Sequence, residues 1–189
     1  MSSLAEEKRF TYKDYATWDN ADGRFELIDG HAYAMASPSP QHQGASVELS
    51  RQLANFSKGK PCKVFTALDV RLNANTFDDI VVQPDILVVC DRSKIDDKSI
   101  IGTPDLVIEI LSPSNRENDT KRKPVLYQRV GVREYWIVDP FMNVVYVYIL
   151  NGEKFNRSII YREDDIVPVH VLEGCQINLS EVFAEDLEY

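Results

Sequence analysis

The chain has few cysteines and no long apolar run, and each absence excludes a class of protein. Cys62, Cys90 and Cys175 lack the CxxC spacing of a zinc site and the density of a disulfide framework, so we expect buried free thiols. No apolar run approaches the roughly 20 residues of a membrane helix, and the start MSSLAEEKRF lacks the apolar core of a signal peptide. The sequence therefore predicts a cytoplasmic protein with no membrane partner.

Positive charge is also scarce. The 21 lysines and arginines face 30 aspartates and glutamates, which gives a formal net charge of −9. This balance argues against a protein that coats nucleic acid without specificity. Local contact stays open, because basic side chains concentrate between residues 116 and 133, either as a solvated helix face or as a phosphate-facing wall.

The length and composition predict a single domain. A chain of 189 residues, 44% hydrophobic and 27% charged, is typical of a globular domain with a sizeable core. It contains no internal repeat and no low-complexity linker, so we place one domain over residues 1–189.

Apolar periodicity and turn residues predict an α/β fold. Residues 10–18 indicate a short helix, 24–36 a hairpin turning at Asp29-Gly30, and 37–59 a long helix. Strands are expected within 62–73, 79–90, 104–111 and 133–139, with a helix around 120–130 that would make a parallel crossover between the last two. Residues 143–172 favour an antiparallel meander, and 178–183 a short capped helix.

Two carboxylates interrupt these apolar strand segments. Asp85 lies in VVQPDILVVC, and Glu109 lies between Ile108 and Ile110. A charge in a buried strand costs several kcal/mol unless it is paired or binds a metal. Two such charges on neighbouring strands predict a shared divalent cation, and Mg²⁺ fits best because it typically uses one or two carboxylates plus water and phosphate. The alternative is a structural role, which for Glu109 would require a buried Lys or Arg partner.

The segments that carry these acids resemble a known family. QPDILVV, PDLVIEILSPSN and DTKRKPVLYQRVGVREYWIVDP are similar to the Uma-two family of endonucleases, within the PD-(D/E)xK nuclease superfamily. The block RFELIDGHAYAMASPSPQHQ extends the resemblance, which runs from about residue 24 to residue 183. It implies a restriction-endonuclease-like mixed β-sheet flanked by helices, and cleavage of DNA phosphodiester bonds with Mg²⁺ or Mn²⁺. We also expect a homodimer.

Site residues follow from the resemblance position by position. Asp85 and Glu109 match the metal-binding carboxylates. The usual superfamily lysine falls at Leu111, which is a departure, and Lys123 on the following helix matches the lysine that substitutes for it. Because Pro124 is tolerated in a helix's first turn, that helix begins either near 119–120 or at Pro124, and a later start would make Lys123 a loop residue.

Five further residues are candidates. Glu26 and His42 match polar positions that line the same cleft, although by residue type alone Glu26 could be a cross-strand partner and His42 a capping residue. Arg116, Lys121 and Arg122 are the predicted DNA-binding side chains, and Lys121 would compete for the role of Lys123 if the helix began later.

Two other functions fit the same residues. One is a catalytically silent nuclease-fold binding or assembly module, and the other is a metal phosphohydrolase acting on a small substrate. A catalytic metal site should leave Asp85, Glu109 and a lysine amine together without a cancelling ion pair. We accordingly expect Lys123→Ala to leave folding nearly intact, and Glu109→Gln to be neutral or stabilising without metal.

Overall fold

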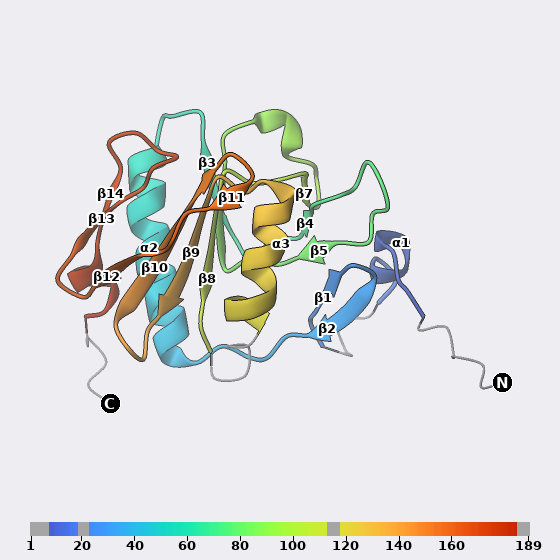
Figure 1. Cartoon of the computed structure of the whole chain (residues 1–189), viewed down its shortest axis with the longest axis horizontal. Coiled ribbons are helices and arrows are strands. Elements are labelled where there is room, and N and C mark those ends of the chain that lie inside the picture. The colour runs from blue at the N-terminus through green and yellow to red at the C-terminus, as the bar shows by residue number, and fades with distance from the viewer. Residues whose placement is uncertain (1–7, 19–22, 113–117, 185–189) are drawn as a thin grey trace.

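A computed structural model of the chain describes residues 8–18, 23–112 and 118–184. A seven-stranded sheet has the order β11-β10-β9-β8-β6-β3, with β12 paired to β10 (Figure 1). Its strands are β3 (Lys63–Thr66), β6 (Ile86–Val89), β8 (Leu106–Ile110), β9 (Glu134–Asp139), β10 (Val144–Asn151), β11 (Lys154–Phe155) and β12 (Ile159–Arg162). Only β8 and β9 pair in parallel among these strands, so the sheet is mixed, as the sequence predicted.

Helices cover both faces of this sheet (Figure 1). On one face, α2 (Pro40–Ser57) packs Ala45, Leu49 and Leu53 into a core shared with β6, β8, β9 and β10. On the other face, α3 (Lys123–Val130) buries Leu126 and Tyr127. Two covered faces explain why the central strands are continuously apolar.

A second sheet lies beside the first and has the order β2-β1-β5-β4-β7. Its strands are β1 (Phe25–Ile28), β2 (His31–Ala34), β4 (Val70–Arg71), β5 (Val81–Val82) and β7 (Ile100–Ile101). The β1–β2 hairpin turns at Asp29 and Gly30, whose φ angles of 50° and 78° are those of the predicted tight turn.

Two of the predicted strands are divided between the two sheets. Residues 62–73 form β3 and β4, and residues 79–90 form β5 and β6. The first segment bends at Ala67, which has a φ of 48°, and the second at Pro84, which has no N–H for a ladder. The Ala67 N–H donates to the Pro84 carbonyl at 3.2 Å, so the two bends face each other. Asp85 therefore lies where the chain passes from one sheet to the other.

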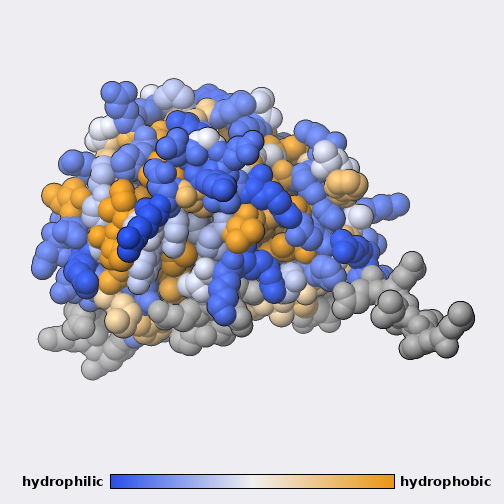
Figure 2. Space-filling model, viewed as in Figure 1, coloured by the Kyte–Doolittle hydropathy of each residue, from blue (hydrophilic) through white to orange (hydrophobic). Residues whose placement is uncertain are grey.

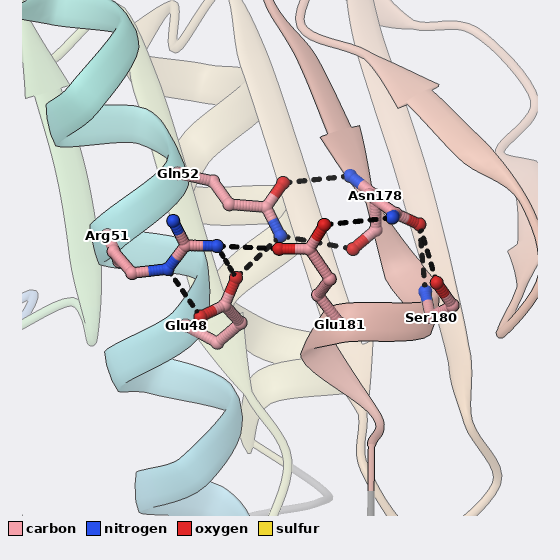
Figure 3. Close-up of polar contacts among 6 residues, drawn as sticks. All are labelled: Glu48, Arg51, Gln52, Asn178, Ser180 and Glu181. Carbon is pink, nitrogen blue, oxygen red and sulfur yellow. Dashed lines mark hydrogen bonds and ion pairs between the residues drawn. The ribbon is translucent and has the colours of Figure 1, made fainter.

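The C-terminal strands are antiparallel but do not form one meander. Strands β11 and β12 continue the large sheet, whereas β13 (Ile166–Pro168) and β14 (Gln176–Asn178) pair only with each other among the described strands. The short helix α4 (Leu179–Val182) follows, with Asn178 as its N-cap. Figure 3 shows Gln52 of α2 exchanging hydrogen bonds with the Asn178 backbone, and Arg51 joining Glu48 to Glu181. These contacts hold the C-terminal segment, from β14 to α4, against α2.

The other described helices are short. They are α1 (Tyr12–Tyr15), the 3-10 turn η2 (Arg92–Lys94) and the π-helical turn η3 (Asn118–Arg122). Within residues 8–18, 23–112 and 118–184, no helix is both long and apolar enough to cross a membrane.

The expectation of three free thiols is wrong. Cys62 and Cys90 form a disulfide, and Cys175 is the free cysteine, buried with its pKa raised to about 11 by burial. The antiparallel pairing of Lys63 with Val89 places the two bonded cysteines opposite each other at the end of β3 and β6. Sequence spacing does not reveal such a cross-strand neighbour.

Candidate active site

Five of the sequence-predicted site residues come together at one place. A cavity of about 370 Å³ lies between α2, the divided strands and β8, and its lining includes His42, Thr66, Asp85, Glu109, Ser112 and Lys123. Glu26 does not line this cavity, but its Oε1 lies 3.0 Å from the Lys123 amine. The structure thus places acidic, basic and imidazole groups from distant parts of the chain around one space.

Asp85 is held by two elements. Its Oδ2 accepts a hydrogen bond from the Ile110 backbone N–H at 2.7 Å and lies 3.2 Å from His42 Nε2. The Asp85 side chain is 22% exposed, so it remains accessible from the cavity. Strand β8 and helix α2 therefore fix the position of this carboxylate without removing it from solvent.

Lys123 lies between two buried carboxylates. Its Nζ is 3.0 Å from Glu26 Oε1 and 3.0 Å from Glu109 Oε1. The side chains of all three residues are at most 5% exposed. The Gln83 backbone N–H also donates to Glu26 Oε1 at 3.0 Å. Glu109 thus has the buried cationic partner that a structural role would require.

The start of α3 explains how Lys123 reaches the carboxylates. The chain is already helical in η3, and α3 proper begins at Lys123 with Pro124 in its first turn, so Lys123 is not a loop residue. The Lys123 side chain is 4% exposed and contacts Glu109, whereas Lys121 is exposed. The geometry thus favours Lys123 over Lys121 for the role that the sequence left open.

Tyr127 is a site residue that the sequence reasoning missed. Its hydroxyl donates to Glu109 Oε1 at 2.6 Å, and the side chain is fully buried. Burial, and then the charge of Glu109, raise the pKa of Tyr127 well above its usual value, so it remains a proton donor. The available signal was its spacing, since residues four apart share a helix face and Tyr127 follows Lys123 by four.

His42 belongs to the cavity and is not the capping residue of α2, which is Ser39. Its backbone N–H donates to the hydroxyl of the N-cap Ser39 at 3.2 Å, which belongs to the start of α2. The His42 side chain is 9% exposed and its Nε2 contacts Asp85, so the imidazole lines the cavity.

Comparison with known proteins identifies the family. The model of the Uma2 family, described as "Putative restriction endonuclease", matches residues 11–180. The chain belongs to the Uma2 family. Uncharacterized protein slr1290 of Synechocystis is 31% identical over 179 residues, which cover 94% of this chain and 90% of that protein. The recognition made from the sequence is therefore confirmed.

A solved structure extends the similarity to the fold of this Uma2 protein. A crystal structure from Anabaena variabilis, described as a putative nuclease belonging to DUF820, superposes with a TM-score of 0.75 at 21% identity. The match covers 92% of this chain and 97% of that one. The predicted fold class, a mixed sheet flanked by helices with antiparallel strands at the C-terminus, is confirmed.

The donor set of the Uma2 cavity suits a hard cation. Asp85 and Glu109 offer carboxylate oxygens to one space, and the described contacts of the Asp85 side chain fall on Oδ2. Mg²⁺ needs only one or two carboxylates plus waters and substrate phosphate, so this pair is enough. Over the described ranges, no group of three or more His, Cys, Asp or Glu side chains is arranged to hold a metal ion.

The expectation of a site without cancelling ion pairs is not met. Lys123 pairs with Glu109 and with Glu26, and His42 contacts Asp85. Among the described residues, the cluster nevertheless contains three carboxylates but only one lysine and one histidine, so acidic groups outnumber basic ones there. This excess favours an added cation, because repulsion between carboxylates grows as they are removed from water.

The predicted DNA-binding residues lie around the start of α3. Arg116 lies outside the described residues. Lys121 and Arg122 are exposed and line a second cavity of about 390 Å³. The Arg122 guanidinium also lies 4.1 Å from the centre of the Tyr33 ring. The face over α3 is largely hydrophilic (Figure 2).

Proposed function

We propose that this Uma2 protein is a Mg²⁺-dependent endonuclease that hydrolyses phosphodiester bonds in DNA, with Mn²⁺ able to replace Mg²⁺. The observation that carries the proposal is that Asp85, Glu109 and Lys123 line one cavity in a chain whose family is described as restriction endonucleases. Hard oxygen donors beside a fixed cation are the groups that this chemistry needs.

Asp85 and Glu109 would hold the metal. When bound, such an ion polarises the phosphate and lowers the pKa of its water. His42 and the Ile110 N–H fix Asp85, while Tyr127 and Lys123 fix Glu109. Two protein groups thus orient each of the proposed metal-binding carboxylates. Hydrogen bonds to metal ligands normally orient those ligands in this way.

Lys123 would act on the charge that develops during cleavage. Its Nζ lies 3.0 Å from each of two carboxylates, and as an ammonium it would donate to a phosphate oxygen or to the attacking water. Glu26 would be a positioning residue, because it touches the amine and not the open part of the cavity. His42 would position Asp85.

The test is cleavage of supercoiled plasmid. We expect nicking or linearisation with Mg²⁺ or Mn²⁺ and none in EDTA. Single-stranded DNA and RNA are assayed in parallel. A parent protein that is inert on all three substrates with both metals would overturn the proposal.

Glu109→Gln is expected to abolish metal binding. The amide keeps an acceptor for the Tyr127 hydroxyl but removes the charge that a divalent ion requires. Titration calorimetry with Mn²⁺ should show binding by the parent and none by the variant. The matched control is Glu48→Gln, a charge lost on the outer part of α2, which should bind Mn²⁺ as the parent does. Unchanged binding by Glu109→Gln would remove Glu109 from the metal site.

Lys121 and Arg122 are proposed to contact DNA phosphate, together with Arg116. Neutralising Lys121 and Arg122 to Gln should weaken DNA binding and reduce the slope of log affinity against log salt by up to about two units. Lys58→Gln with Lys60→Gln, at the far end of α2, gives a control of equal charge change. An equal loss of slope in both double variants would mean a general charge effect and no phosphate-facing wall.

The binding-module alternative also has an observation in its favour. Lys123 already occupies the space between Glu26 and Glu109, as it would in a purely structural ion pair. DNA binding without cleavage in the assays above would favour this alternative. Hydrolysis of p-nitrophenyl phosphate without plasmid cleavage would instead favour a small-substrate phosphohydrolase.

The assembly and location of the chain are further proposals. We propose a single domain over residues 1–189 that forms a homodimer, which light scattering on the purified protein would test. We also propose a cytoplasmic location. A disulfide such as Cys62–Cys90 is uncommon in the reducing cytoplasm. Counting the free thiols of the protein after extraction from cells under acid quench therefore tests this location.

A further inference from the structure

A third cavity, of about 380 Å³, lies at the N-terminal end of the molecule and has an aromatic wall. Its lining includes Tyr12, Tyr15, Trp18, Phe25, Asp69 and Gln83. The proposed cleavage uses none of these side chains. The volume is within the usual range for small-ligand pockets, so it can hold one planar ring system with its sugar.

The aromatic rings form a connected group. The Trp18 ring centre lies 5.3 Å from that of Tyr15 and 5.7 Å from that of Phe25, and Tyr12 stacks near Tyr15 at 6.1 Å. All four side chains are only half-buried, although aromatic rings of this size usually gain most by full burial. They therefore leave flat apolar surface accessible from the cavity.

Polar groups fill the other side of the same cavity. Gln83 Nε2 donates to Asp69 Oδ1 at 2.6 Å and to the Tyr15 hydroxyl at 3.2 Å. Arg24 donates to Gln83 Oε1 from Nε at 3.1 Å and from Nη2 at 2.7 Å. The Tyr15 hydroxyl donates to Asp69 Oδ1 at 3.1 Å, so these groups hold one another in place. The described hydrogen bonds of the Asp69 carboxylate fall on Oδ1, and its second oxygen can accept from the amino group of a heterocycle.

This aromatic cavity adjoins the candidate active site. Arg24 lines both cavities. Gln83 connects them as well, since its side chain lies in the aromatic cavity while its backbone N–H donates to the Glu26 oxygen that Lys123 contacts. Gln83 is also two residues before Asp85. A ligand that spans both cavities would therefore place its phosphate and its ring at neighbouring sites.

We propose that the aromatic cavity binds one unpaired nucleobase of the strand whose phosphate lies at Asp85 and Glu109. The base stacks against Trp18 and Tyr15, an amino group on its edge donates to Asp69, and Arg24 contacts the backbone between the two cavities. Bases inside a duplex are already stacked, so the substrate class is a single strand or a flipped nucleotide. This inference rests on the proposed function.

Trp18 provides a direct readout. The chain has two tryptophans, and Trp136 is fully buried in the core, so changes on ligand binding report on Trp18. Titration of the parent protein in EDTA with a short single-stranded oligonucleotide should quench its fluorescence. An oligonucleotide of the same length and charge made entirely of abasic residues should not quench it, and should bind roughly 5- to 100-fold more weakly, because stacking on one aromatic platform is worth this much.

Variants separate stacking from general binding. We measure binding of labelled strands by anisotropy. The preference for base-bearing over abasic strands should be lost in Trp18→Ala and also in Trp18→Leu, which keeps apolar bulk at the same position if the alanine variant folds poorly. Phe141→Ala removes an exposed ring from the turn between β9 and β10 and should keep the preference.

The outcomes distinguish this inference from the proposed cleavage. Base-dependent binding in EDTA, with no cleavage of plasmid, single-stranded DNA or RNA by the metal-loaded protein, supports the aromatic cavity and rejects the nuclease. Plasmid cleavage with equal binding of base-bearing and abasic strands overturns the aromatic cavity alone. Failure to bind either strand, or an equal preference in Trp18→Ala, Trp18→Leu and the parent, also overturns it.

Discussion

Replacing Lys123 by methionine is expected to lower the melting temperature in EDTA by roughly 6 to 20 °C. The Lys123 amine lies between the Glu26 and Glu109 carboxylates, 3.0 Å from each, and all three side chains are buried. Removing one partner of a buried ion pair typically costs about 3–5 kcal/mol, because the remaining charges lose their compensation. In a chain of this length each kcal/mol corresponds to roughly 2–4 °C, which scanning calorimetry resolves easily.

Mg²⁺ should partly reverse this loss. With the ammonium gone, the carboxylates have more need of a cation, so Mg²⁺ should raise the melting temperature of Lys123→Met by more than it raises that of the parent. Cleavage should fall by about 10² even when the variant is folded, since a donor to the developing charge is missing. Lys121→Met is the matched control, an exposed lysine two residues away whose loss should change stability by less than about 0.5 kcal/mol. An equal and small change in both variants would contradict the buried ion pair.

The structure thus replaces two expectations drawn from the sequence. Lys123→Ala was expected to leave folding intact, and Glu109→Gln to be neutral or stabilising. Glu109 instead accepts hydrogen bonds from Lys123 and Tyr127, so its neutralisation removes favourable contacts and not only repulsion. Both substitutions are now expected to destabilise the fold without metal.

Asp85→Asn is expected to reduce Mg²⁺-dependent cleavage by at least about 10³. A bound metal supplies several kcal/mol of transition-state stabilisation, and about 4 kcal/mol corresponds to this factor. The fold should be little affected, because the asparagine oxygen can still accept the Ile110 N–H and the side chain is partly exposed. Initial rates on plasmid and a melting curve in EDTA measure the two effects separately.

Asp105 offers a closely matched control for Asp85. Each aspartate follows a proline and precedes a strand of the large sheet, and each accepts a hydrogen bond from a backbone N–H, that of Cys90 in the case of Asp105. Asp105, however, pairs with Arg133 and does not line the cavity. Asp105→Asn should therefore keep the parent rate. Equal activity of the two variants would remove Asp85 from the catalytic site.

Local sequence determined the elements and singled out the two acids. The Asp29-Gly30 turn and the start of α2 at Ser39 follow from the conformations and hydrogen bonds of a few adjacent residues. Glu109 could be recognised because a charge buried within an apolar strand is costly wherever that strand lies. Asp85 was expected within a strand too, but it lies just before β6 and is partly exposed, because the chain bends there. These features need no knowledge of which segments meet.

Only the tertiary structure decided what surrounds those acids. The bends at Ala67 and Pro84 divide two predicted strands between sheets, the pairing of β3 with β6 joins Cys62 to Cys90, and the start of α3 brings Lys123 to Glu109. The partners of Glu109 on α3 are 14 and 18 residues distant, and Glu26 meets Lys123 across nearly one hundred positions. Such contacts depend on how the sheets and helices pack, and a local pattern of residues does not reveal that packing. The sequence therefore located the carboxylates, whereas the packing determined which charged groups surround them.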